Sequence, residues 1–180
     1  MADAKIVTLT TDFGTRDPYV AAMKGVLLRE CPRATVVDIT HEIPPQDLLA
    51  ASLVLAEATA EFPAGTLHLV VVDPTVGTDR RILAGRFGGQ RYLFPDNGVI
   101  TMVSANHPAE QLVAVSNTRY LPAAARSMTF HGRDVFAPLA AHVLNGVALR
   151  QLGPAPRTHR VLELPAPVVR RDEIVGEVIH

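Results

Sequence analysis

The chain has 180 residues, of which 48% are hydrophobic and 19% charged, and its formal net charge is −1. This composition supports one sizeable core and excludes a disordered chain. The charge balance provides no basic face for nucleic acid, and no apolar run reaches the roughly 18 residues expected of a membrane-spanning helix. Cys31 is the only cysteine, which rules out a disulfide framework and a cysteine-based zinc site. With no signal-peptide pattern at the start, the expected compartment is the cytoplasm.

The first part of the sequence alternates between strand-like and helix-like segments. Apolar residues at helical spacing predict one helix over about residues 18–30 and another that carries Leu48 to Phe62. The predicted strands are Lys5–Thr10, Ala34–Ile39 and Thr66–Val72. Ala34–Ile39 is apolar on both faces, which predicts a buried parallel strand. Alternating strands and helices predict βαβ units with right-handed crossovers.

The later segments extend this α/β pattern. The sequences "ILAGRF" and "RYLFP" flank a turn at Gly88–Gln90 and predict a hairpin, and "QLVAVS" predicts a further strand. The stretch "GRDVFAPLAAHVLNGVAL" after "TFH" predicts a helix, with Pro138 as an interruption. The sequence therefore predicts an α/β fold with a largely parallel sheet flanked by helices.

Prolines and glycines concentrate between residues 153 and 167, which is typical of a linker. The strand-like "EIVGEVIH" follows and leads to His180. We therefore expect a catalytic α/β domain over 1–152, a Pro-rich linker over 153–167 and the beginning of a small β domain over 168–180.

In open parallel sheets, ligands bind beyond the carboxyl ends of the strands, so the loops at these ends are the first candidates for a site. The polar residues that gather in these loops are Asp12, His41, Asp73, Arg80, Asp96, Asn97, His131, Arg133 and Asp134. Several have an ordinary structural interpretation. Asp12 fits an Asx-turn, His41 a cap on the following turn, and Asp96 with Asn97 a tight turn. The remaining pair, Arg133 and Asp134, fits surface charge near a helix N-terminus.

Asp73 and His131 are harder to explain as structural residues. Asp73 leaves a buried strand, where an uncompensated carboxylate is costly, and Arg80 is close enough in sequence to pair with it. His131 precedes a predicted helix, whose N-terminus disfavours the imidazolium form. A carboxylate, a guanidinium and a neutral imidazole around one pocket would hold and orient a water molecule. A metal site built from Asp12, Asp73 and His131 is an alternative, but scattered carboxylate and histidine residues are a weak signal, and no metal is predicted.

Five motifs in order carry a resemblance to a known family: "TDFGTRDPYVAAMKG", "DITHEIPPQD", "VVDPTVGTDRR", "PDNG" and "TFHGRDVFAP". Together they resemble the S-adenosyl-L-methionine (SAM) hydroxide adenosyltransferases, adenosine-forming SAM hydrolases related to the fluorinase and chlorinase. The resemblance implies that water attacks C5′ of the adenosyl group and that L-methionine leaves. It places the catalytic triad on Asp73, Arg80 and His131. The halide-using relatives carry Tyr in place of Asp73 and Tyr–Ser in place of His131–Gly132, so the resemblance favours the water-using branch.

The resemblance also implies a set of substrate-binding residues. Asp12 would hold the ribose hydroxyls, because a carboxylate can accept two hydroxyl donors. Gln46 stands where halogenating relatives carry an aromatic residue that shields the ribose. The other expected contacts with the substrate are Pro74, Thr75, Val76, Thr129, Phe130 and Gly132.

The family continues past "GEVIH" into a small β domain with an aromatic–Gly–Asn motif, which is not found in these 180 residues. The family's trimer places the site between the large domain of one subunit and the small domain of its neighbour, so the resemblance implies a homotrimer. It implies no cofactor besides the substrate. The alternative is a non-catalytic module that binds adenosine or SAM. Whether His131 acts as a base or only orients the water is left open by the sequence.

Overall fold

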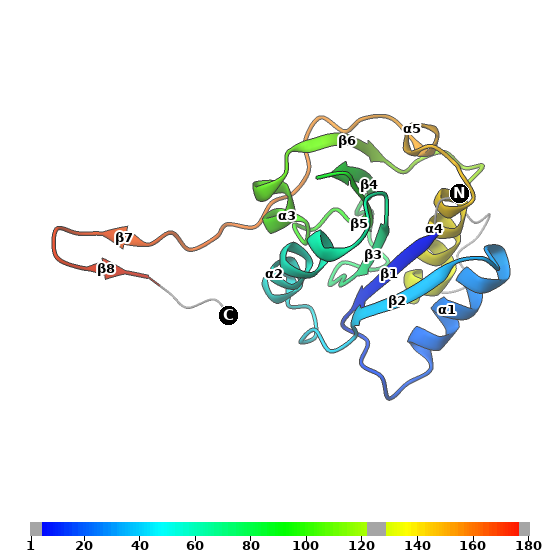
Figure 1. Cartoon of the computed structure of the whole chain (residues 1–180), viewed down its shortest axis with the longest axis horizontal. Coiled ribbons are helices and arrows are strands. Elements are labelled where there is room, and N and C mark those ends of the chain that lie inside the picture. Colours follow the sequence, from blue (N-terminus) through cyan, green and yellow to red (C-terminus); the bar gives the residue numbers. More distant parts are fainter. Residues whose placement is uncertain (1–4, 122–128, 177–180) are drawn as a thin grey trace.

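The structure, a computed structural model, describes residues 5–121 and 129–176, and Figure 1 shows its elements. A six-stranded sheet has the order β2-β1-β3-β5-β4-β6, and a separate pair of strands forms β7-β8. The strands of the large sheet are β1 Ile6–Thr11, β2 Thr35–Thr40, β3 Leu67–Val71, β4 Ile82–Phe87, β5 Gln90–Pro95 and β6 Ala109–Ala114. The helices are α1 Tyr19–Glu30, α2 Leu48–Ala58, the 3-10 turn η1 Thr59–Glu61, α3 Thr101–Asn106, the π-helix η2 Gly132–Phe136, α4 Ala137–Leu144 and α5 Leu149–Leu152.

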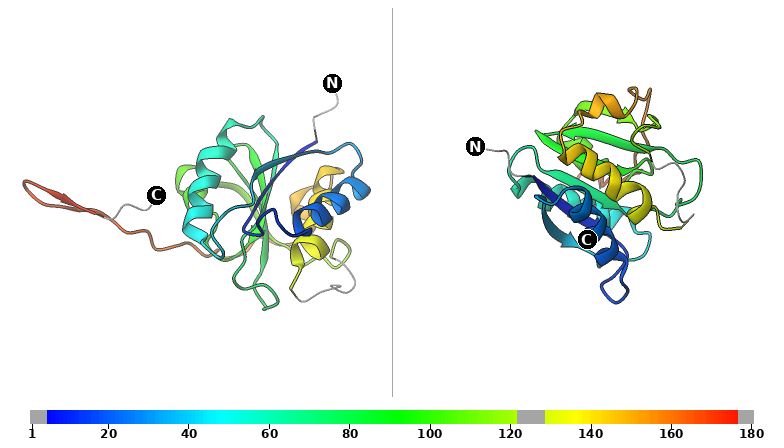
Figure 2. Two further views of the ribbon diagram at one scale, coloured as in Figure 1. Left: turned by 90° about the horizontal axis from the view of Figure 1, so that it is seen from below. Right: turned by 90° about the vertical axis from the view of Figure 1, so that its right-hand side faces the viewer.

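Four neighbouring strands, β2, β1, β3 and β5, run parallel, whereas β4 is antiparallel to both β5 and β6. Helices α1 and α4 cover one face of the sheet and α2 and α3 cover the other (Figure 2). Each face has its own core: Met23, Leu27 and Leu139 lie in one, Leu55 and Phe94 in the other. The predicted α/β fold with a largely parallel, helix-flanked sheet is confirmed.

Local sequence explains where the main helices form. In α1, Val20, Met23 and Leu27 recur at helical spacing and are buried against the sheet. Helix α2 begins after Asp47, whose carboxylate accepts a hydrogen bond from the Ala50 N–H at 2.9 Å and so caps the helix.

Two predictions about these elements are wrong. The strand predicted at Ala34–Ile39 is parallel, but β2 lies at the edge of the sheet and none of its residues is fully buried. The helix predicted to run from Gly132 through Leu149 is divided into η2, α4 and α5. Helix α4 ends before Gly146, whose φ of +95° is unfavourable for other residues. Pro138 lies in the first turn of α4, where its missing N–H costs little.

Residues 153–176 form an arm that leaves the body of the molecule (Figure 1). Its first part is bound along the sheet and α3, beginning with a hydrogen bond from the Ala114 N–H to the Pro154 carbonyl. Its far part is a small hairpin of β7 Val168–Val169 and β8 Ile174–Val175, with all four residues exposed. The division into a domain, a linker and a second domain stays a prediction, and residues 177–180 lie outside the described residues. Within 5–121 and 129–176, no helix has the length and apolarity needed to cross a membrane.

Candidate active site

The loops predicted to carry chemistry meet at one end of the parallel strands. The register of β1 and β3 pairs Thr11 with Val71, so Asp12 and Asp73 follow at the same end of adjacent strands. The loop after β1 also contacts the segment before η2, because the rings of Phe13 and Phe130 meet edge to face at 6.0 Å. Segments far apart in the sequence therefore surround one site, as the rule for parallel sheets predicts.

Asp73 and Arg80 form a shielded ion pair in the loop after β3. Arg80 Nε and Nη2 each lie 2.6 Å from Asp73 Oδ2, and the two side chains are only 5% and 3% exposed. The other carboxylate oxygen, Oδ1, accepts hydrogen bonds from the Thr75 N–H at 3.2 Å and the Thr75 hydroxyl at 3.0 Å. Both oxygens of Asp73 are thus bound by donors, which fixes the orientation of the carboxylate.

His131 completes this network through the same guanidinium. Arg80 Nη2 lies 3.0 Å from His131 Nδ1. A guanidinium can only donate, so Nδ1 must be the acceptor, and the neutral ring then carries its proton on Nε2. Burial and the adjacent Arg80 charge lower the pKa of His131, and Asp73 opposes them only in part. The sequence predicted a neutral imidazole because of the helix N-terminus. In the structure, burial and the charge of Arg80 are the main reasons why the pKa of His131 is lowered.

A glycine and a π-helix place His131 at this position. Gly132 opens η2 and is buried, and a Cβ atom there would lie 3.0 Å from Met23 Sδ and 3.1 Å from the Phe13 ring. A larger residue would push these neighbours away. Four residues after Gly132, the Phe136 ring is fully buried, and the Arg80 guanidinium lies 5.6 Å from its centroid. The same π-helix therefore supports both His131 and Arg80.

Asp12 and Gln46 are joined by a hydrogen bond between the Asp12 carboxylate and the Gln46 backbone. Asp12 Oδ2 accepts a hydrogen bond from the Gln46 N–H at 2.9 Å. Gln46 has φ of +67°, which is uncommon for a residue other than glycine and indicates a locally strained turn. The second oxygen of the partly exposed Asp12 carboxylate has no such backbone contact in the described structure and is available for hydroxyl donors.

His41 links the loops after β1 and β2, which is a larger role than the predicted turn cap. Its buried ring lies 2.9 Å from the Thr11 hydroxyl through Nδ1, and its carbonyl accepts a hydrogen bond from the Gly14 N–H at 2.7 Å. Its Nε2 lies 3.0 Å from Asp38 Oδ1, although not in hydrogen-bond geometry. Burial would raise the pKa of Asp38, but Lys24 and His41 outweigh it and lower that pKa.

The other expected substrate contacts differ in exposure. Pro74 and Thr129 are exposed, whereas Thr75, Val76 and Phe130 are half-buried. Phe130 packs edge to face against Tyr19 at 5.0 Å. The aromatic cluster of Phe13, Tyr19 and Phe130 was not anticipated, although Phe13 and Tyr19 both lie in the first motif of the sequence.

Two acidic candidates have other partners. The Asp134 side chain is 5% exposed and pairs with Arg133 at 2.7 Å, and the Arg133 guanidinium lies 4.7 Å from the Phe130 ring centroid. Asp96 pairs with Arg81. Within the described part of the chain, no three His, Cys, Asp or Glu side chains are arranged to hold a metal ion.

Comparison with known proteins shows which family and which structures this chain resembles. The model of the SAM hydroxide adenosyltransferase N-terminal domain matches residues 7–153. The (R)-S-adenosyl-L-methionine hydrolase of Salinispora tropica is 41% identical over 99% of this chain and 69% of its own length. A fluorinase from Actinoplanes sp. is 30% identical over 90% of this chain and 62% of its own length.

Among solved structures, an uncharacterized conserved protein from Thermotoga maritima superposes with a TM-score of 0.89 at 39% identity, covering 97% of this chain and 67% of its own. The family model matches most of the chain, and these relatives support that match. The chain belongs to the SAM hydroxide adenosyltransferase family.

Proposed function

We propose that this protein hydrolyses S-adenosyl-L-methionine to adenosine and L-methionine. The observation that carries the proposal is the shielded chain of contacts from Asp73 through Arg80 to His131, in a family whose curated relatives are named (R)-S-adenosyl-L-methionine hydrolase. In the reaction, an oxygen–C5′ bond forms and the C5′–sulfur bond breaks. The bonding electron pair goes to sulfur, which becomes the neutral thioether of methionine, and one proton is released.

In this proposal, Arg80 organises the site. Its guanidinium binds the Asp73 carboxylate and the His131 ring at the same time, so it fixes the positions of both groups. The sulfonium is already a good leaving group, so the main task of the protein is to align and desolvate a water molecule.

The contact with Arg80 supports a role for His131 as an orienting donor. Because Nδ1 accepts from Arg80, the Nε2–H is the group that can donate to a water oxygen. Attack by neutral water gives a protonated alcohol, which is strongly acidic, so its proton can pass to Asp73 or to solvent without a strong base. In this proposal His131 acts by orientation, which is one of the two roles that the sequence left open.

Asp12 binds the ribose hydroxyls in this proposal, and Gln46, Pro74, Thr75, Val76, Thr129, Phe130 and Gly132 surround the substrate. The proposed site has no cofactor, so a chelator such as EDTA is expected to leave turnover unchanged. We also propose a homotrimer in the cytoplasm. Light scattering on the purified chain would test the trimer, because a monomer at all concentrations contradicts it.

The central experiment is to incubate the protein with S-adenosyl-L-methionine and to separate the products by chromatography. Adenosine and methionine are expected in equal amounts. Tight substrate binding by calorimetry without adenosine would contradict hydrolysis and favour the alternative of a binding module.

Single substitutions separate the proposed roles. Asp73→Ala and His131→Ala are expected to lower kcat, whereas Asp12→Ala is expected mainly to raise KM. Equal losses of kcat and affinity in all three variants would contradict the assignment.

A further inference from the structure

The loop that carries Asp73 and Arg80 passes over the end of another strand. It connects β3 to β4, yet β5 lies between these two strands in the sheet. Because β4 is antiparallel to β5, the loop begins and ends at the end of the sheet where β5 also ends. Asp96 and Asn97 directly follow β5 and therefore lie beneath this loop.

These two residues bind the two ends of the loop separately. Asn97 Nδ2 donates to the carbonyl of Val72 at 2.9 Å, directly before Asp73. Asp96 Oδ2 accepts from Arg81 Nε at 2.8 Å and also from Arg81 Nη2, directly after Arg80. The backbones agree with this arrangement, since the Asp96 N–H donates to the Arg81 carbonyl at 3.0 Å.

Turn formation does not account for the Asp96 carboxylate. The side-chain bond typical of an Asx-turn here belongs to Asn97, whose Oδ1 accepts from the Val99 N–H at 3.1 Å. The Asp96 side chain is only 4% exposed, and its donors come from Arg81 and from the backbone of Arg160. A buried carboxylate with distant partners requires an explanation other than local geometry.

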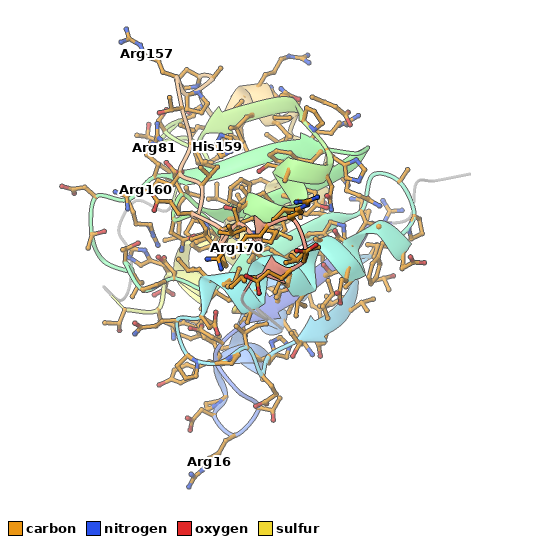
Figure 3. The ribbon with its side chains drawn as sticks, turned by 90° about the vertical axis from the view of Figure 1, so that its left-hand side faces the viewer. Arg16, Arg81, Arg157, His159, Arg160 and Arg170 are labelled. Carbon is orange, nitrogen blue, oxygen red and sulfur yellow. The ribbon has the colours of Figure 1, made fainter. Side chains whose placement is uncertain are left out.

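The same carboxylate also holds the arm. Asp96 Oδ1 accepts from the Arg160 N–H at 2.8 Å, and Arg81 Nη2 donates to the Thr158 carbonyl at 2.8 Å. Figure 3 shows Arg81 beside Arg160 and His159 on this side of the molecule, with Arg16 at the far end. Asp96 is therefore the point where the catalytic loop, the end of β5 and the arm meet.

We propose that Asp96 is a positioning residue for the reaction: by holding Arg81, it keeps the adjacent Arg80 where its guanidinium reaches both Asp73 and His131. This inference rests on the proposed function. Arg80 must meet two partners at 2.6 and 3.0 Å, so a small displacement of its backbone breaks at least one contact. The Asp96 carboxylate also binds the arm, so the position of the arm depends on the position of the loop.

Kinetics of three variants test the proposal. Asp96→Asn removes the charge that holds Arg81 and is expected to lower kcat about 10- to 100-fold, as displaced catalytic groups do. Thr101→Val removes the hydroxyl that accepts from the Leu162 N–H of the arm and donates to the Gly98 carbonyl, while leaving the Asp96–Arg81 contact in place. Its expected loss in kcat is at most about threefold. Glu110→Gln, a carboxylate that accepts from the Gly89 N–H away from the site, is the matched control and should leave kcat unchanged.

The proposal is overturned if kcat of Asp96→Asn stays within about threefold of the parent, or if Thr101→Val loses as much. Circular dichroism and thermal melting establish that each variant is folded. If Asp96→Asn does not fold, Arg81→Lys replaces it, because lysine keeps the charge but loses the contact through two nitrogens. A kcat of Arg81→Lys equal to that of the parent would then contradict the proposal.

A readout that needs no turnover keeps this inference separate from the proposed function. The ring resonances of His131 are expected to shift in Asp96→Asn but not in Glu110→Gln, because Arg80 moves away from Nδ1 only in the first. If the parent makes no adenosine, the proposed function fails, while unchanged His131 resonances in Asp96→Asn would separately refute the positioning role.

Discussion

Acidification should destabilise this protein through one buried histidine. His68 lies in β3 with no exposed surface. Its Nδ1 is 2.8 Å from the Thr8 hydroxyl, and its Nε2 has no hydrogen-bond partner within residues 5–121 and 129–176. Burial, together with the charge of Arg91, lowers the pKa of His68 from 6.5 to about 3. The neutral ring fits the core, and the charged ring does not.

The sign and size of the effect follow from proton linkage. Below the unfolded pKa of 6.5, the unfolded chain takes up a proton that the folded chain refuses until about pH 3. Stability contributed by His68 is therefore present above pH 6.5 and is lost as the pH falls. At about 1.4 kcal/mol per pH unit, the loss in the free energy of unfolding between about pH 7 and about pH 5 is about 2 kcal/mol.

Urea unfolding of the parent and of His68→Asn at both pH values measures this contribution. Asparagine keeps a polar atom near the position of Nδ1 but does not titrate, so the variant should lose about 2 kcal/mol less than the parent on acidification. Subtracting the two pH dependences removes the contribution of the other histidines. His107→Asn, at an exposed position, is the matched control and should follow the parent. Parallel pH dependences of His68→Asn and the parent would refute the reasoning.

Three further predictions concern the site and the base of the arm. Arg80→Lys should lower kcat about 100-fold, because an ammonium cannot reproduce the planar contacts to Asp73 and His131; activity close to that of the parent would contradict the network. The rate should fall at acid pH as His131 becomes protonated, because a protonated Nδ1 can no longer accept from Arg80. The midpoint should lie below the ordinary 6.5, since the pKa of His131 is lowered, and a midpoint above 6.5 in a pH–rate profile would be inconsistent. Gly153→Ala should lower the free energy of unfolding by about 1–3 kcal/mol, because the new Cβ would lie only 1.9 Å from the Ala114 carbonyl oxygen. Urea unfolding measures this loss, and an unchanged unfolding midpoint would contradict it.

The sequence allowed the architecture and the central contacts to be predicted because both depend on short-range patterns. Alternating apolar segments place the strands, and the position of ligands in parallel sheets selects the loops that follow them. The pairing of Asp73 with Arg80 was predicted because a carboxylate that leaves a buried strand needs a nearby cation, and the structure places them 2.6 Å apart. The functional roles of these residues remain proposals.

Other features could not be predicted because they depend on contacts that sequence spacing does not report. The valines and isoleucine of β2 favoured a buried strand, whereas the strand order places β2 at an edge, where Asp38 pairs with Lys24. The π-helix at Gly132–Phe136 breaks the helical period that the prediction assumed. Asp96 and Asn97 were interpreted only as a turn, because the sequence does not show which residues they bind. Their partners are Arg160, which lies 64 residues from Asp96, and the two ends of another loop.

The crossing of the loop over β5 also determines where the chain can change in length. Its two ends lie on strands two positions apart, so they are separated by about 10 Å, and Asp96 and Asn97 hold that span fixed. Additional residues near Gly77, which has φ of +80°, would lengthen only the crest of the loop. Lengthening by two residues adds about 0.2 kcal/mol of closure entropy, so length variation is inexpensive at the crest. The same two residues inserted beside Val72 or Arg81 would separate the catalytic side chains from the contacts that position them.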